Sequence, residues 1–145
     1  MKKFIVLTAV FFMGVFFAQE PIKNLSKEDI PIEVANLVDI STVTFMIDTE
    51  PSFPGGMSAF RKEFSQNFNT FALDKTDGGT LKTVVYYVVE VDGSILYVKA
   101  IGENESFNKE AERALKSIKT RYAPAKVNNL VVRHILRMPL SMNFK

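Results

Sequence analysis

Residues 50–67 read EPSFPGGMSAFRKEFSQN, and this stretch decides how the chain folds. It combines prolines, which hold the backbone extended, with glycines, which permit a sharp turn. The residues that make this turn are Pro51, Phe53, Pro54, Gly55 and Gly56. We expect a rigid corner that docks the next element on a sheet, in preference to a ligand-binding loop.

A helix is predicted directly after the corner. Its apolar side chains recur at spacings of three and four residues, at Met57, Phe60, Phe64 and Phe68. Charged and polar residues occupy the opposite side, so one face of this helix is expected to pack on a core.

The composition indicates one modest globular domain. The chain has 145 residues, of which 47% are apolar, and its formal net charge is +2. Residues 1–18 hold two lysines and no acid, so the remainder carries 16 basic and 16 acidic side chains. A neutral remainder gives no electrostatic reason to expect binding to nucleic acid. The absence of cysteine excludes disulfides, thiolate metal sites and a cysteine nucleophile.

The N-terminus is typical of an export signal. Lys2 and Lys3 precede an uncharged apolar run from Phe4 to Ala18, which is shorter than the roughly 20 residues that span a bilayer as a helix. We therefore interpret residues 1–18 as a signal peptide that is cleaved before Gln19, which predicts a periplasmic protein. The alternative is an uncleaved short anchor, which would hold the protein at the inner membrane.

The rest of the chain divides into a lead-in segment, residues 19–41, and a domain, residues 42–145. The lead-in shows no sustained helical or strand period, so we expect little regular structure there. Alternating side chains at Val43, Phe45 and Ile47 predict a short half-buried strand that runs into the corner.

A hairpin is predicted near the middle of the chain. Residues 80–91 form the clearest strand pattern, and Ser94 to Ile101 form the returning strand. Asp92 and Gly93 between them are the favoured pair for a two-residue type I′ turn. Irregular alternation in the returning strand predicts a bulge.

A second helix is expected over residues 104–121, with Asn108 as N-cap and a buried stripe of small and aliphatic residues. Tyr122 and Pro124 end it. Asn128 and Asn129 then form a turn, and residues 130–138 form a last strand, with Pro139 stopping continuous pairing beyond it.

The residues do not build an active site. His134 is the single histidine and lies on the more apolar face of the last strand, where a packed neutral side chain is expected. No nucleophile-elbow, phosphate-loop or zinc-ligand motif accompanies it, so we expect neither catalysis nor a cofactor or metal.

A binding surface is the remaining function. A small antiparallel sheet leaves edges, and an exposed edge accepts an extended peptide through backbone hydrogen bonds. We predict the last strand as that edge, with partner-binding positions Asn129, Val131, Arg133, Ile135 and Arg137. An ordinary edge defended by its arginines is the alternative that we keep open.

Five motifs in series resemble the C-terminal domain of TonB-type energy transducers. They are Pro51-x-Phe53-Pro54-Gly55-Gly56, Val88-Val89-Glu90-x-Asp92-Gly93-Ser94-Ile95, Asn108-Lys-Glu-Ala-Glu-Arg113, Tyr122-x-Pro124-Ala125 and Met138-Pro139-Leu-Ser-Met-Asn-Phe144. The resemblance covers about residues 45–145. The spanning anchor and the long proline-rich spacer that complete transducers carry have no counterpart in the motifs of this resemblance.

The resemblance implies a two-layer α+β domain, in which an antiparallel sheet of about three to four strands packs against two helices. It also implies binding of a short extended segment of an outer-membrane transporter, or of another envelope protein, by strand addition in energy-coupled transport. The alternative is a structural protein of the periplasm that forms a homodimer through the same edge. Contact with the membrane is expected only if residues 1–18 remain attached.

Overall fold

The computed structural model describes residues 15–17, 25–74 and 79–144 of the chain. The described residues form an antiparallel main sheet with strand order β1-β6-β2-β3 and a separate hairpin. The main sheet consists of β1 (Val15–Phe17), β2 (Gly79–Val89), β3 (Ile95–Ile101) and β6 (His134–Phe144), and the hairpin of β4 (Ala125–Val127) and β5 (Leu130–Val132). The predicted α+β class with a small antiparallel sheet is confirmed.

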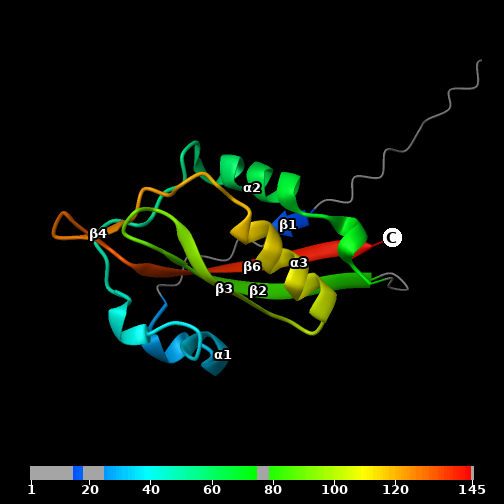
Figure 1. Cartoon of the computed structure of the whole chain (residues 1–145), viewed down its shortest axis with the longest axis horizontal. Coiled ribbons are helices and arrows are strands. Elements are labelled where there is room, and N and C mark those ends of the chain that lie inside the picture. Colours follow the sequence, from blue (N-terminus) through cyan, green and yellow to red (C-terminus); the bar gives the residue numbers. More distant parts are fainter. Residues whose placement is uncertain (1–14, 18–24, 75–78, 145) are drawn as a thin grey trace, which may run out of the picture.

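Two helices cover one face of this sheet, as predicted. They are α2 (Gly56–Asn67) and α3 (Glu105–Lys116), whose buried side chains share one cluster with the sheet, whereas α1 (Ile32–Ala35) contributes to a second cluster. Figure 1 shows α2 on the side of the sheet opposite to α1. Phe60 and Phe64 of α2 are fully buried in the core that the two helices share with the sheet. Met57 is 51% exposed, so it does not belong to the buried stripe on which the pattern had placed it.

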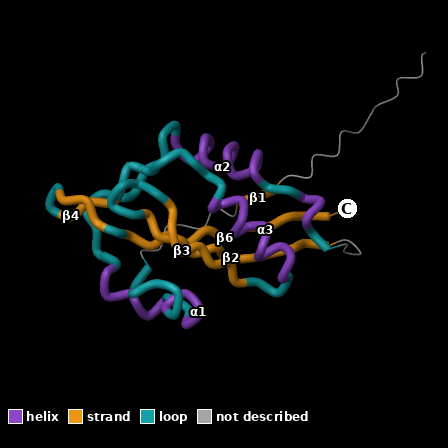
Figure 2. Tube along the Cα trace, in the orientation of Figure 1, coloured by secondary structure: helices purple, strands orange, loops and turns teal. Residues whose placement is uncertain are grey.

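Residues 25–48 cover the second face of the sheet. This segment forms short turns, η1 (Lys27–Asp29), α1 and η2 (Ile40–Thr42), as the tube in Figure 2 shows. Its side chains form a second buried cluster with the sheet, made of Val34, Val38, Val43, Tyr86, Val88 and Ile135. The second core therefore draws on residues before and after residue 42.

The prediction of a strand over residues 43–47 is wrong. These residues form no ladder, and the nearest pairing is an isolated bridge between Thr49 and Lys126 of β4. The segment instead crosses from the second face to the edge of the sheet, where the Thr44 N–H donates to the Arg133 carbonyl at 2.9 Å. Apolar alternation alone could not distinguish this crossing from a strand.

The turn between β2 and β3 consists of three residues, 91–93, which the pair Glu90 and Ser94 closes. It is not the predicted two-residue type I′ turn. Gly93 has φ +83° but Asp92 does not have positive φ, and the Gly93 N–H donates to the Glu90 carbonyl at 2.8 Å. The Asp92 carboxylate accepts hydrogen bonds from the backbone N–H and the hydroxyl of Ser94, at 2.9 and 2.6 Å. These bonds stabilise a type I turn followed by a left-handed glycine.

The two-residue turn with two positive φ values lies elsewhere, at Asn128 and Asn129 between β4 and β5 (φ 49° and 63°). Both asparagines tolerate the left-handed region better than other residues with a side chain.

The returning strand β3 contains the predicted irregularity, because its register with β2 shifts beside Tyr97, whose φ is 53°.

Helix α3 (Glu105–Lys116) begins within one residue of the predicted range, but its N-cap differs from the predicted one and it ends earlier than predicted. Its N-cap is Asn104, whose Oδ1 accepts the Phe107 N–H at 2.8 Å, while Asn108 lies inside the first turn and donates to the Gly102 carbonyl at 2.8 Å. The helix ends at Lys116, and the Glu63 carboxylate accepts the Lys119 N–H at 3.2 Å beyond that end.

The predicted corner joins α2 to the middle of the fold. Gly55 and Gly56 have φ values of +82° and +80°, which residues with a side chain adopt only under strain. Phe53 is buried edge-to-face against Phe60 and Tyr122, with ring centroids 5.4 and 5.2 Å away. These ring contacts hold the start of α2 on the core.

The proposed signal cleavage after Ala18, the first residues of the lead-in and residues 75–78 of the loop before β2 lie outside the described residues. Among the described residues, no helix has the length and apolar content that crossing a membrane requires.

Candidate functional site

The outer edge of β6, on the side away from β2, is the candidate site. Backbone groups alternate in direction along a strand, so one hydrogen bond fixes the direction of the others. The Glu90 N–H donates to the Ser94 carbonyl at 2.9 Å, so even-numbered residues of β2 face β3 and odd-numbered residues face β6. Odd-numbered residues of β2 pair with even-numbered residues of β6, such as Val85 with Met138. The odd-numbered residues of β6 therefore direct their backbone groups to the outer edge.

Pro139 is one of these outward-facing residues. It pairs opposite Val84 and β6 continues to Phe144, so the prediction that Pro139 stops the strand is wrong. Proline lacks an N–H, but at this position the missing N–H belongs to the outer edge and leaves the bonds to β2 intact. The outer edge therefore lacks a donor at Pro139 and regains one at Ser141.

The outer edge at Leu140–Met142 is occupied by β1. Val15 pairs with Met142, Phe16 with Ser141 and Phe17 with Leu140, all antiparallel. Because Ser141 faces outward, Phe16 and Ser141 exchange the backbone hydrogen bonds of this pairing. An extended three-residue segment from the start of the chain has thus been added to the sheet at the end of the chain, as Figure 1 shows beneath α2.

Leu140 and Met142 make this part of the edge apolar on the face that α2 and α3 cover. Leu140 and Met142 are 2% and 0% exposed and belong to the same core cluster as Phe60 and Phe64 of α2. Ser141, between them, has its side chain on the opposite face. The edge at this point therefore presents an apolar face under α2.

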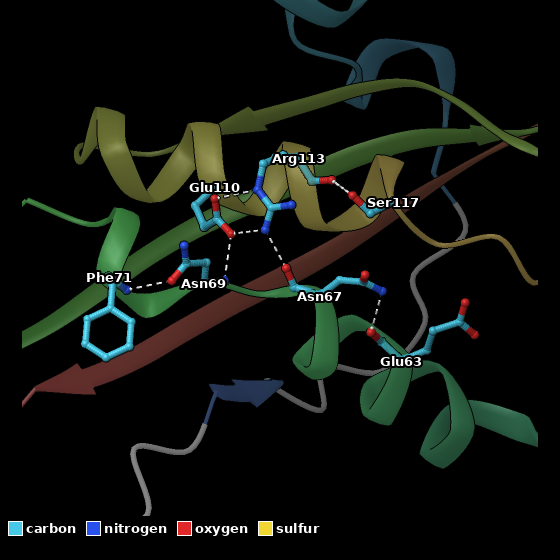
Figure 3. A network of polar contacts seen from close by, with 7 residues as sticks. All are labelled: Glu63, Asn67, Asn69, Phe71, Glu110, Arg113 and Ser117. Carbon is cyan, nitrogen blue, oxygen red and sulfur yellow. Dashed lines mark hydrogen bonds and ion pairs between the residues drawn. The ribbon is translucent and has the colours of Figure 1, made fainter.

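A network of polar contacts fixes the end of α2 against α3 (Figure 3). The buried Glu110 carboxylate accepts the Asn69 N–H at 2.7 Å and Arg113 Nε at 2.9 Å, and a second guanidinium nitrogen of Arg113 also donates to it. Arg113 donates in addition to the Asn67 carbonyl, the last residue of α2. Phe71 points away from this network and is 96% exposed.

The network lowers the pKa of Glu110. Burial acts in the opposite direction and raises the pKa, but the hydrogen bonds from Arg113 and from the Asn69 N–H, with the charge of Arg113, outweigh it. The carboxylate is therefore charged at neutral pH, and it connects the ends of two helices that lie over the sheet.

The structure separates the five predicted partner-binding residues. Asn129 is in the β4–β5 turn, Val131 pairs with Lys126 of β4, and Arg133 lies between β5 and β6. Ile135 and Arg137 are the two that lie in β6, and both face the outer edge with their backbone groups. The side chain of Ile135 is 1% exposed in the second core cluster, so its backbone alone borders the edge.

Arg133 is held by the fold. Its guanidinium pairs with Glu90 at 2.8 Å, donates to the Thr42 hydroxyl and lies 5.5 Å from the centroid of the Tyr97 ring. The side chains of Arg133 and Glu90 are 21% and 15% exposed. This arginine ties residues 25–48 to the sheet.

His134 is buried, as the sequence predicted. Its side chain is 7% exposed and Nδ1 lies 2.7 Å from the Thr44 carbonyl, with which it shares a hydrogen bond. Among the described residues, no cluster of three or more histidine or acidic side chains is arranged to hold a metal ion.

Another buried polar pair is formed by the hydroxyls of Tyr87 and Tyr122, 3.0 Å apart. Burial raises the pKa of Tyr122 to about 12 and that of Tyr87 well above its usual value. Both hydroxyls are therefore neutral and satisfy each other in the core.

Sequence reasoning missed Leu140, Ser141 and Met142 because it ended the strand at Pro139. A signal was present: Leu136, Met138, Leu140 and Met142 continue the apolar alternation of the strand past the proline. Comparisons with family models, with curated proteins and with solved structures found no match for this chain.

Proposed function

We propose that this protein is an exported binding module that recognises an extended peptide segment by strand addition at the outer edge of β6. One observation carries the proposal: β1, an extended segment from the other end of the chain, pairs antiparallel with Leu140–Met142. Strand addition gives affinity through main-chain hydrogen bonds and specificity through alternate side chains. Under this proposal the protein is not an enzyme.

The partner class rests on the resemblance to TonB-type C-terminal domains. It is an outer-membrane transporter segment or another envelope protein, and the binding serves energy-coupled transport. The five motifs from Pro51 to Phe144 support this part of the proposal, and the export signal in residues 1–18 supports a periplasmic location.

A chemical-shift titration of ¹⁵N-labelled residues 19–145 with N-terminal segments of outer-membrane transporters tests the proposal. We expect the largest amide shifts at Ser141 and its neighbours in β6. Absence of binding, or shifts confined to α2 and α3, would contradict strand addition.

A substitution at Ser141 sharpens this test. Ser141→Pro removes the outward N–H and leaves the bonds between β6 and β2, because those use the even-numbered residues of β6. We expect at least about tenfold weaker peptide binding, since one backbone acceptor of the peptide loses its donor. The matched control, Ser141→Ala, keeps the N–H and is expected to bind like the wild type.

Self-association through the same edge is the rival function. Sedimentation across a concentration range separates the two: a stable dimer whose formation Ser141→Pro prevents would favour an assembly role over peptide recognition.

A further inference from the structure

We infer that Val15–Phe17 is a built-in occupant of the peptide edge at Leu140–Met142, so that this part of the edge opens for a partner only when the N-terminal segment is removed. This inference rests on the proposed function, because it concerns the same edge of β6. It specifies when the site is available and which side chains a partner strand needs in order to bind there.

The geometry makes the two occupants mutually exclusive. Just before β6 the Arg133 carbonyl already accepts the Thr44 N–H at 2.9 Å, and Pro139 offers no donor to the edge. Ser141 is the first residue past the proline that directs both an N–H and a carbonyl outward, and β1 pairs with it through Phe16. A partner strand that uses Ser141 has to displace β1.

The register of β1 also defines the class of ligand. Residues directly opposite each other on antiparallel strands share one face of the sheet. Residues opposite Leu140 and Met142 therefore fall on the face that α2 covers, whereas the residue opposite Ser141 falls on the other face. The edge fits an extended segment with apolar residues at its first and third paired positions.

The described residues of both buried clusters lie outside residues 1–18. Both buried clusters, as described, consist of residues between 25 and 142, including the two helices, the segment over the second face and strands β2, β3 and β6. A chain that begins at Gln19 therefore retains every described residue of both clusters and loses β1. The expected signal cleavage after Ala18 falls one residue beyond the end of β1, so maturation would remove the occupant.

Binding of the chain's own segment in trans tests this inference. The probe is a synthetic peptide with residues 12–20, FMGVFFAQE, titrated into residues 19–145 and into the full chain. If β1 occupies the edge in at least nine of ten full-length molecules, at most one molecule in ten can bind the peptide. The apparent affinity of the full chain is then at least about tenfold lower. We therefore expect the peptide to bind residues 19–145 at least about tenfold more tightly than the full chain, with amide shifts at Ser141.

Two variants of the full chain control for the extra length. Phe16→Pro removes the N–H that pairs with Ser141, so it is expected to bring the affinity of the full chain to within about twofold of that of residues 19–145. Phe4→Pro makes the same change in the same apolar run outside β1 and is expected to leave binding weak. Slow amide exchange at Ser141 in the full chain, lost in Phe16→Pro, is the expected independent readout.

Equal affinities of the full chain and of residues 19–145, or no binding of the peptide to residues 19–145, would overturn the inference. Neither result decides the proposed function, because transporter segments are tested separately against residues 19–145. Conversely, failure of every transporter segment while the chain's own peptide binds at Ser141 would refute the proposed partner and leave the built-in occupant standing.

Discussion

Replacement of Glu110 by glutamine is expected to loosen the attachment of α2 to α3. The Glu110 carboxylate is 4% exposed and receives three N–H donors, one from the Asn69 backbone and two from Arg113. Glutamine has nearly the same volume, but its amide group is a donor where the carboxylate has a second acceptor. One of the surrounding donors is therefore left facing another donor.

The cost follows from these contacts. A hydrogen bond to a charged group contributes about 1.5–3 kcal/mol, and breaking a fully buried ion pair costs about 3–5 kcal/mol. Arg113 is 52% exposed, so water hydrates its guanidinium when the substitution removes the charged partner. The range of about 3–5 kcal/mol for a fully buried ion pair therefore does not apply. We expect Glu110→Gln to lower the free energy of unfolding by about 2 kcal/mol, or roughly 8 °C in Tm for a domain of this size.

The effect has a defined pH dependence. The pKa of Glu110 in the folded protein lies below its ordinary value of 4.5, so the unfolded chain takes up a proton first as the pH falls. The stabilisation by the carboxylate is complete above about pH 5 and is lost as the pH falls through the folded pKa. The difference between wild type and Glu110→Gln is thus expected to shrink below about pH 4.5.

Urea unfolding followed by circular dichroism between pH 7 and pH 3.5 measures both effects. Glu105→Gln is the control, because Glu105 forms an exposed ion pair with Lys109 on the same helix, at 2.7 Å, and its loss is expected to leave the midpoint unchanged. A Glu110→Gln midpoint equal to that of the control at pH 7, or a deficit that stays constant down to pH 3.5, would refute the role assigned to the network.

Three further predictions concern the fold. Gly93→Ala is expected to cost about 3 kcal/mol or more in urea unfolding, because φ is +83° and an added Cβ would lie 2.0 Å from the Tyr122 carbonyl oxygen. Tyr87→Phe or Tyr122→Phe alone leaves a buried hydroxyl unpaired and is expected to cost about 1–3 kcal/mol, with the double variant costing less than the sum. Because burial raises the pKa of Tyr122 to about 12, the wild type should lose stability above about pH 10, where the unfolded chain ionises first, and the double variant should not. Asn104→Ala is expected to cost about 1 kcal/mol as loss of the N-cap, whereas a cost confined to Asn108→Ala would restore the cap predicted from the sequence.

The resemblance to TonB-type domains indicates the class of partner, whereas the backbone directions of β6 indicate where the edge accepts a strand. The partner class and the position of the edge are thus two separate parts of the proposed function. The direction of the backbone at Ser141 follows from the pairing of β6 with β2, whatever partner the edge receives. The tests with Ser141→Pro and with the transporter segments therefore examine the two parts separately.

Local patterns were sufficient for the elements that depend on nearby residues. The glycines after Pro54 determine where α2 begins, and the spacing of Phe60 and Phe64 determines which side of it is buried. The alternation in residues 80–91 predicted β2 to within two residues at either end. In each case the decisive interactions lie within one turn or one strand.

Tertiary structure decided whatever depends on the register between distant segments. Whether Pro139 ends a strand depends on which side its missing N–H would face, and pairing with Val84 settles that. Whether residues 25–48 lead into the domain or cover it depends on a second apolar sheet face that their own sequence does not reveal. From the sequence alone, an apolar strand is predicted near the end of the chain, where β6 lies. The pairing of β1 with Leu140–Met142 shows where the edge of β6 accepts another strand, because backbone groups alternate and proline removes one donor from that edge.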